Sequence, residues 1–158
     1  MSSVPVAIAL GSNLGDRRAH LRWAIEQLGR RLQHVRESSF IETDPVGVSE
    51  PQPAYLNAVV VGETDLEPAA VIEWLLTLER GRGRERASFR AARTLDLDLI
   101  LYGDRVIDTP TLTVPHPRFR ERAFVLDPLS EIAPDWIDPV TGRTIRQLRD
   151  RPRRSAEA

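Results

Sequence analysis

The sequence has no cysteine, no lysine and no long hydrophobic run. The absence of cysteine excludes disulfides, thiolate metal sites and a cysteine nucleophile. The first apolar run, residues 4–10, is too short for a membrane span, and no basic residue precedes it, so no signal peptide is expected either. The 158 residues fit one domain of ordinary size. We therefore expect a single domain over residues 1–158, with its core at about 4–148, in a cytoplasmic protein without a membrane partner.

Because lysine is absent, each of the 22 basic residues is arginine, against 23 acidic residues. The net charge of −1 gives the molecule no overall attraction for polyanions and argues against a nucleic-acid partner. The arginines are nevertheless crowded in residues 80–93 and again directly after His116. Guanidinium groups there could neutralise a polyphosphate. The alternatives are a solvated loop, which the cluster alone favours, and a nonspecific nucleic-acid patch, which would bind with a steep salt dependence.

The hydrophobic pattern predicts an α+β fold. Alternating or β-branched apolar runs predict strands at residues 4–10, 38–42, 56–63 and 95–101. Helical stripes predict a helix that is capped by Asn13 or Asp16 and reaches Leu32, a second that begins at Pro68, and a weak third at 144–149. Irregular loops are expected at 44–53 and 80–93, and a flexible basic tail at 149–158. The order β-α-β-β-α-β predicts a ferredoxin-like core, with helices packed on a mostly antiparallel sheet, plus a C-terminal extension.

The strongest chemical signal is the alternation of leucine and aspartate over residues 95–99. Alternate residues of a strand share a face, so Asp96 and Asp98 project together, about 6.5–7 Å apart at Cα, while the leucines face the core. Oxygen ligands this close suit Mg²⁺, which takes one or two carboxylates together with phosphates. Two such ions can clamp a reacting polyphosphate. The alternation alone fits a solvated sheet face equally well, but the arginines before it favour the metal site.

Other positions suit the binding of a nucleotide or a flat ring. His116 stands between two prolines, which constrain the backbone and aim the imidazole, so it could hydrogen-bond a phosphate oxygen. Tyr55 and Asn57 share a strand face and, with Phe124, would suit a heterocycle. Taken singly, a histidine is more often structural and an aromatic ring more often packs in a core. Residues 11–16 match neither the dinucleotide fingerprint nor the P-loop, so a tight turn with a helix cap is expected.

Several segments together resemble one enzyme family. They are Gly11-Ser12-Asn13-Leu14-Gly15, Ser38-Ser39-Phe40, Tyr55-Leu56-Asn57-Ala58, Arg93-Thr94-Leu95-Asp96-Leu97-Asp98, Val114-Pro115-His116-Pro117, and Arg122-Ala123-Phe124-Val125-Leu126 with Pro128-Leu129. In order and spacing they are similar to 6-hydroxymethyl-7,8-dihydropterin pyrophosphokinase over roughly residues 5–135. The Arg-Thr-Leu-Asp-Leu-Asp and Pro-His-Pro segments are the most specific.

The resemblance implies that the hydroxymethyl oxygen of the pterin attacks the β-phosphorus of ATP and that AMP leaves, as a step of folate biosynthesis. It implies ATP as the co-substrate, two Mg²⁺ ions held by Asp96 and Asp98, and a monomer. The residues implied to be catalytic are Arg84, Arg86, Arg93, Asp96 and Asp98. Those implied to bind ATP are Glu79 (through the ribose), Arg93, Leu99, His116 and Arg122. The implied pterin pocket contains Thr43, Asp44, Val46, Tyr55, Asn57 and Phe124.

The chain departs from the family pattern in three places. Arg90-Ala91-Ala92 stands where the family has Trp-Gly-Pro, Leu76 where a glutamine often contacts the nucleotide, and Asp44 where a proline is common. Because loops of this kind gate turnover, weaker nucleotide use than in a typical member is expected. The alternative function is a noncatalytic pterin- or nucleotide-binding paralogue on the same fold.

Overall fold

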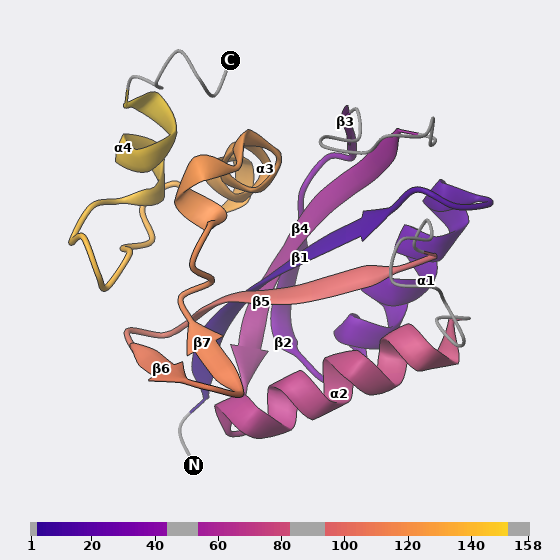
Figure 1. The fold of residues 1–158 in the computed structure, drawn as a ribbon, viewed down its shortest axis with the longest axis horizontal. Helices are drawn as coiled ribbons and strands as arrows, with labels where there is room; N and C mark the ends of the chain where they lie inside the picture. Colours follow the sequence, from indigo (N-terminus) through magenta and orange to yellow (C-terminus); the bar gives the residue numbers. More distant parts are fainter. Residues whose placement is uncertain (1–2, 44–53, 83–93, 152–158) are drawn as a thin grey trace.

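The protein folds as a mixed α/β structure around an antiparallel sheet (Figure 1). The computed structural model describes residues 3–43, 54–82 and 94–151. The strands are β1 (Val4–Ser12), β2 (Gln33–Glu37), β3 (Ile41–Thr43), β4 (Tyr55–Thr64), β5 (Asp96–Tyr102), β6 (Ile107–Thr109) and β7 (Leu112–Val114). The helices are α1 (Arg17–Gly29), α2 (Pro68–Gly81), α3 (Ala123–Ile132) and α4 (Ile145–Asp150), with a short 3₁₀ turn, η1 (Phe119–Glu121).

The sheet has the order β2-β4-β1-β5, and β3 pairs with the first residues of β4. All of these pairings are antiparallel. The long β1 and β4 are apolar almost throughout because they lie in the middle of the sheet and are covered on both faces. Strands β6 and β7 form a separate hairpin beyond β5.

Helices α1 and α2 cover one face of the sheet. In α1 the buried residues Leu21, Ala24 and Leu28 follow helical spacing, and Asp16 caps the helix by accepting a hydrogen bond from the Ala19 N–H (3.1 Å). In α2, Pro68 occupies the first turn, where a missing N–H costs nothing. The larger hydrophobic core lies between these helices and the sheet, and it includes the inward-facing leucines of β5.

Helices α3 and α4 lie on the opposite face and enclose a second core, which contains Val59 and Val61 of β4 (Figure 1). The turn before α4 is held by Asp138, which is fully buried and accepts hydrogen bonds from Arg120 Nη2 (2.9 Å) and the Thr141 hydroxyl (2.8 Å). Burial alone would raise the pKa of Asp138, but these hydrogen bonds and the Arg120 charge outweigh it, so the pKa is lowered. A capping box of Thr144 and Gln147 then starts α4.

The structure confirms the strands expected at 4–10, 56–63 and 95–101 and both long helices. The strand expected at 38–42 is confirmed only at residues 41 and 42: β2 ends at Glu37, and β3 begins at Ile41. The chain leaves the ladder between them because the Ser39 N–H and hydroxyl hydrogen-bond the carboxylate of Glu131 in α3. Strand β2 was missed because its residues are mostly polar and exposed.

Other boundaries also differ from the expectation. Helix α1 ends at Gly29, and Leu32 is buried beyond it because its side chain packs against Gly62 of β4. Helix α3 was not predicted, since Pro128 inside it reads as a helix breaker. Helix α4 continues to Asp150, two residues into the segment expected to be a tail. The loop expected at 80–93 starts later than predicted, because α2 continues to Gly81. The rest of that loop from residue 83, the loop expected at 44–53 and the tail from residue 152 lie outside the described residues.

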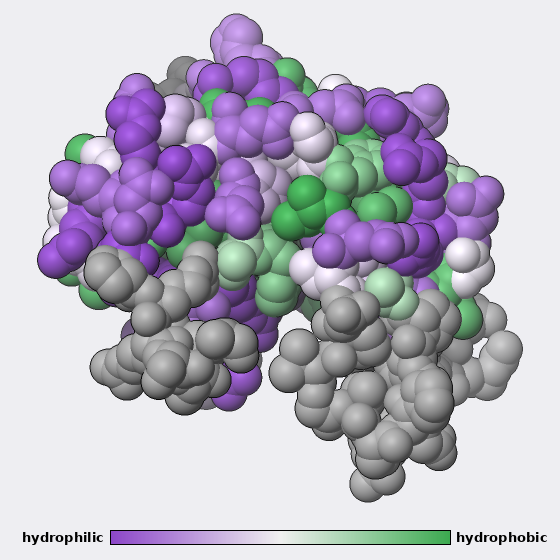
Figure 2. All heavy atoms as spheres, turned by 90° about the horizontal axis from the view of Figure 1, so that it is seen from above, coloured by the Kyte–Doolittle hydropathy of each residue, from purple (hydrophilic) through white to green (hydrophobic). Residues whose placement is uncertain are grey.

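Polar side chains dominate the face shown in Figure 2, with a smaller apolar area between them. In the parts of the chain that the structure describes, no helix is both long enough and apolar enough to cross a bilayer.

Candidate active site

The candidate site is built around Gly11, near the end of β1. Gly11 pairs with Asn57 of β4 on one side and Asp96 of β5 on the other. Opposed residues in antiparallel strands point to the same face, so the Asn57 and Asp96 side chains flank the glycine. A Cβ on Gly11 would lie 3.3 Å from Asn57 Oδ1 and 3.6 Å from Tyr55 Cδ1. The missing side chain therefore makes room for both residues of β4.

The two aspartates of β5 project from the same face, as predicted. Asp98 pairs with Ala9, the next residue of β1 on this face, while Leu97 and Leu99 are buried in the core under α1 and α2. Asp96 is half-buried and Asp98 is exposed. The described residues contain no group of three or more Asp, Glu, His or Cys placed to hold a metal ion. A pair of carboxylates nevertheless fits Mg²⁺, which completes its coordination with water and phosphate oxygens.

Tyr55 lies close enough to Asp96 to feel its charge. Burial raises the pKa of the Tyr55 phenol, and the negative charge of Asp96 raises it further. The phenol therefore stays neutral at physiological pH. Tyr55 lies two residues before Asn57 on the same face of β4, and its phenol is on the side of Asp96.

Asn57 is oriented by β3. Only 5% of Asn57 is exposed, and its Nδ2 donates a hydrogen bond of 2.8 Å to Thr43 Oγ1. This bond settles which way the amide points, and its Oδ1 lies beside Gly11. The structure thus brings together three of the residues assigned to the pterin pocket, namely Thr43, Tyr55 and Asn57.

His116 is attached to β5 by its backbone and stands near Asp98. Its N–H donates to the Ile100 carbonyl (3.0 Å), and its Nδ1 accepts from the Arg118 N–H (3.1 Å). Burial lowers the pKa of His116; the Asp98 charge raises it, and the charges of Arg122 and Arg118 lower it again. The ring is therefore neutral near pH 7, and because Nδ1 is an acceptor, the proton is on Nε2. A neutral imidazole of this tautomer offers Nε2–H as a hydrogen-bond donor.

Arg122 is the N-cap residue of α3, and Phe124 lies in the first turn of that helix. The Arg122 guanidinium carbon lies 5.6 Å from the centre of the Phe124 ring, a cation–π contact, and both side chains are partly exposed. Because Arg122 and Asp98 both act electrostatically on His116, the start of α3 and this aspartate of β5 lie near the same imidazole. Asp98, His116 and Arg122 thus converge, although they come from three separate segments.

Glu79 and Leu99 have a different setting. The Leu99 side chain is 4% exposed and lies in the core on the face opposite the aspartates, so any contact with a nucleotide would involve its backbone. Glu79 of α2 is also 4% exposed, and its Oε2 accepts a hydrogen bond of 2.7 Å from the Leu97 N–H. The Glu79 carboxyl therefore contacts the strand between the two aspartates.

The remaining predicted site residues, Asp44, Val46, Arg84, Arg86 and Arg93, lie outside the described residues. Two contributors were missed in the sequence. Gly11 could have been found as a glycine inside a strand, which often marks a close approach. Arg118 contributes to the site through its backbone N–H, which donates to His116 Nδ1, and nothing in the sequence indicates which residue's backbone will do so.

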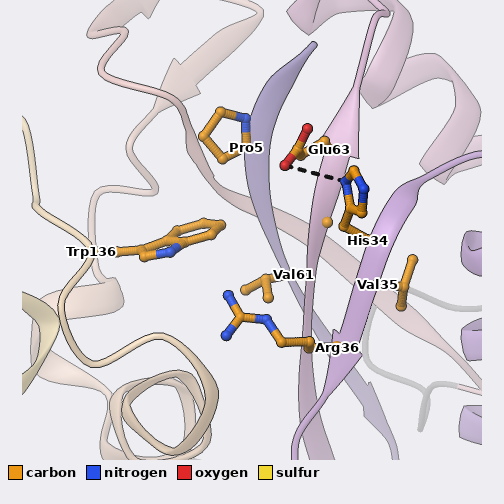
Figure 3. Close-up of a pocket in the computed structure, with 8 residues that line it drawn as sticks. Pro5, His34, Val35, Arg36, Val61, Glu63 and Trp136 are labelled. Carbon is orange, nitrogen blue, oxygen red and sulfur yellow. Dashed lines mark ion pairs between the residues drawn. The ribbon is translucent and has the colours of Figure 1, made fainter.

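A second hollow lies on the same sheet face but at the other end of β1 and β4. It has a volume of about 420 Å³ and lies between Trp136 and the β2 edge, with Pro5 and Val61 in its wall (Figure 3). Its rim carries an ion pair between His34 Nδ1 and Glu63 Oε2 at 3.5 Å. No residue of the candidate site contributes to it.

Comparison with known proteins gives one consistent family. A profile of 7,8-dihydro-6-hydroxymethylpterin-pyrophosphokinase (HPPK) matches residues 7–134. The 2-amino-4-hydroxy-6-hydroxymethyldihydropteridine pyrophosphokinase of Synechocystis is 43% identical over 143 residues, which are 89% of this chain and 72% of that protein. The enzyme of the same name from Bacillus subtilis is 45% identical over 127 residues, which are 79% of this chain and 75% of that protein.

The fold has solved counterparts as well. The HPPK-DHPS of Plasmodium falciparum superimposes with a TM-score of 0.71 at 13% identity, over 94% of this chain. The chain spans 41% of that longer protein, so this likeness concerns the fold of the matched part. With a family profile that covers most of the chain and bacterial relatives at more than 40% identity, the chain belongs to the 7,8-dihydro-6-hydroxymethylpterin-pyrophosphokinase family.

Proposed function

We propose that the chain transfers the pyrophosphoryl group of ATP to the hydroxymethyl oxygen of 6-hydroxymethyl-7,8-dihydropterin and releases AMP, as a step of folate biosynthesis. The observation that carries the proposal is the convergence of Asp98, His116 and Arg122 beside Asp96, next to an amide and two aromatic rings. The charged residues and the histidine suit a polyphosphate with its metal ions, and the amide with the two aromatic rings suits a flat heterocycle. The relatives named as pyrophosphokinases support this assignment.

The proposed metal ligands are Asp96 and Asp98. Two Mg²⁺ ions bound there would neutralise charge on the polyphosphate and orient it. The two carboxylates on one strand face provide ligands without filling a coordination shell, which leaves positions for phosphate oxygens.

The proposed nucleotide contacts use the donors around β5. His116 would donate through Nε2–H, and Arg122 would pair with phosphate oxygens, as would Arg84, Arg86 and Arg93. Leu99 would contribute through its backbone. The resemblance to the family would place Glu79 at the ribose, whereas the Glu79 carboxyl already accepts the Leu97 N–H in the structure. No side-chain base for the alcohol is assigned, so these residues would act by positioning and by neutralising charge.

The proposed pterin pocket contains Thr43, Asp44, Val46, Tyr55, Asn57 and Phe124. Asn57 would hydrogen-bond the edge of the heterocycle, because Thr43 holds its amide in one orientation. Tyr55 and Phe124 would contact the ring faces.

We further propose that residues 1–158 form one domain that acts as a monomer. The sheet order supports a ferredoxin-like classification, with the segment from β6 onward as the C-terminal extension. Light scattering of the purified chain would test the monomer: a dimer mass would contradict it.

The deciding experiment measures Mg²⁺-dependent AMP release from ATP, with and without 6-hydroxymethyl-7,8-dihydropterin. Asp98→Ala should abolish pterin-dependent AMP formation with the fold unchanged by circular dichroism, because it removes half of the proposed metal site. Asp108→Ala, which removes an exposed aspartate of the β6–β7 hairpin, is the matched control and should retain activity. If wild type binds the pterin but never forms AMP, the chain is a binding paralogue and the proposed function is wrong.

A further inference from the structure

Strand β5 carries both aspartates, yet it lies at one end of the sheet formed by the part of the chain that the structure describes. An edge strand has a neighbour on one side only, and the N–H groups of alternate residues on its other side lack a ladder partner. Such groups need another acceptor when they are buried. In this protein the Leu97 N–H, between Asp96 and Asp98, donates to Oε2 of Glu79 at 2.7 Å.

The acceptor is itself held firmly. Glu79 lies in the last turns of α2 and is only 4% exposed. On the same helix, Val71, Leu75 and Leu78 pack into the core that also contains Leu97 and Leu99. The hydrogen bond therefore joins a packed helix to the backbone of Leu97, the one residue that separates the two aspartates. A buried carboxyl that accepts an N–H makes a stronger and more directional bond than a solvated one.

The geometry points to Glu79 as a positioning residue for the Asp96–Asp98 pair, acting through the Leu97 amide. This inference rests on the proposed function, since it assigns a task within that site. In a strand the directions of neighbouring side chains follow the backbone between them, so a rotation at Leu97 would change the spacing of the two carboxylates. Glu79 prevents that rotation and takes the place of a neighbouring strand. This role differs from ribose binding, in which the carboxyl would contact the nucleotide itself.

The two roles of Glu79 predict different responses to a nucleotide that lacks the ribose hydroxyls. We would compare ATP with 2′,3′-dideoxy-ATP in wild type, Glu79→Ala and Glu79→Gln. If Glu79 acts through Leu97, removing the hydroxyls should change kcat/KM by the same factor in wild type and in Glu79→Ala. If Glu79 acts through the ribose, the dideoxy nucleotide should lose activity in wild type and lose nothing further in Glu79→Ala, which would overturn the inference.

The metal dependence gives a second readout. Glu79→Ala should raise the Mg²⁺ concentration for half-maximal rate several-fold, and excess Mg²⁺ should restore part of the activity, because its carboxylate pair is intact but badly spaced. Glu79→Gln keeps an oxygen acceptor for the Leu97 N–H, so its Mg²⁺ concentration for half-maximal rate should be close to that of wild type. Glu73→Ala removes an exposed carboxylate from the same helix and should match wild type in every measurement. An unchanged Mg²⁺ requirement in Glu79→Ala would contradict the inference.

Measurements that need no turnover separate this inference from the proposed function. Hydrogen exchange of the Leu97 amide, followed by NMR, should be at least about tenfold faster in Glu79→Ala while Leu99 and the α2 amides keep their rates. Mn²⁺ binding in the presence of α,β-methylene-ATP should weaken in the same variant. If wild type forms no AMP, the proposed function fails, and these two readouts still decide the role of Glu79. Unchanged Leu97 exchange overturns that role even if the enzyme is active.

Discussion

At the scale of single residues, the candidate site depends on a side chain that is missing. Gly11 separates Asn57 from Asp96, and a Cβ there would lie within 3.3 Å of Asn57 Oδ1, tighter than an ordinary van der Waals contact. The atoms within 4 Å of that position all belong to β4, and the nearest is the amide oxygen of Asn57, whose Nδ2 is hydrogen-bonded to Thr43. The space that Gly11 leaves is therefore part of the binding geometry.

We predict that Gly11→Ala raises the KM for the pterin roughly tenfold with a smaller effect on the KM for ATP. The added methyl displaces Asn57, and overpacking of this kind costs about 1–3 kcal/mol. Steady-state kinetics with each substrate varied in turn measures the split. Gly29→Ala is the control, since nothing lies within 4 Å of a Cβ at that position and α1 should be unaffected or slightly stabilised. Equal pterin KM values in Gly11→Ala and wild type would contradict the proposed pocket.

At the scale of elements, helix α3 controls the position of β3. The carboxylate of Glu131 accepts hydrogen bonds from the Ser39 N–H (2.9 Å) and the Ser39 hydroxyl (2.7 Å), in the segment that leads from β2 into β3. Strand β3 has only three residues and carries Thr43, the acceptor for Asn57. So short a strand needs support from outside its ladder.

We predict that Glu131→Ala raises the pterin KM by about fivefold and speeds hydrogen exchange of the β3 amides, since a lost hydrogen bond costs about 1 kcal/mol. Glu131→Gln retains an oxygen acceptor, so its pterin KM and β3 exchange rates should lie between those of Glu131→Ala and wild type. Glu26→Ala removes a carboxylate from an exposed pair with Arg30 on α1 and should leave both readings unchanged. Faster exchange in β3 without a change in KM would show that β3 does not support the pocket.

At the scale of the whole molecule, two histidines connect stability to pH. Burial lowers the pKa of His116 and of His20; in His20 the Arg82 charge lowers it further, while Asp16 and a hydrogen bond with the Leu14 backbone raise it. Arg82 Nε donates to His20 Nδ1 at 2.9 Å, which links α1 to the end of α2. In the folded protein each imidazole is therefore neutral at pH 7. Protonation would place its positive charge near the positive charges of neighbouring arginines.

We predict that the free energy of unfolding falls as the pH drops below about 6.5, the pKa of an unfolded histidine. Between the lowered folded pKa and 6.5 the unfolded state binds more protons, so stability is complete above 6.5 and declines through the folded pKa values. Urea unfolding at pH 7.5 and 5.5 measures the decline, and His20→Asn together with His116→Asn should flatten it. A steep decline in the double variant would assign the pH dependence to other groups.

How much of the site could be predicted differs from residue to residue. The alternation at 95–99 was enough to place Asp96 and Asp98 on one face, because a strand has a period of two whatever surrounds it. The grouping of Asp98 with His116 and Arg122 could not be derived from spacing, since it depends on how the segment after β7 returns to the sheet. Glu79 was assigned to ATP by resemblance, and its contact with the Leu97 N–H is visible only in three dimensions.

The sequence by itself determined the long strands, the two amphipathic helices and the chemistry of the carboxylate pair, because these follow from local periodicity and residue type. Tertiary structure decided the rest. Helix α3 forms despite Pro128 because its apolar residues are buried against β4, and β2 forms from polar residues because β4 offers a ladder to pair with. The N–H of Leu97, the residue between the two aspartates, has its partner in Glu79 of α2, 18 residues earlier in the chain. Such contacts depend on long-range packing, which outweighs local propensity wherever a surface must be buried or a backbone group satisfied.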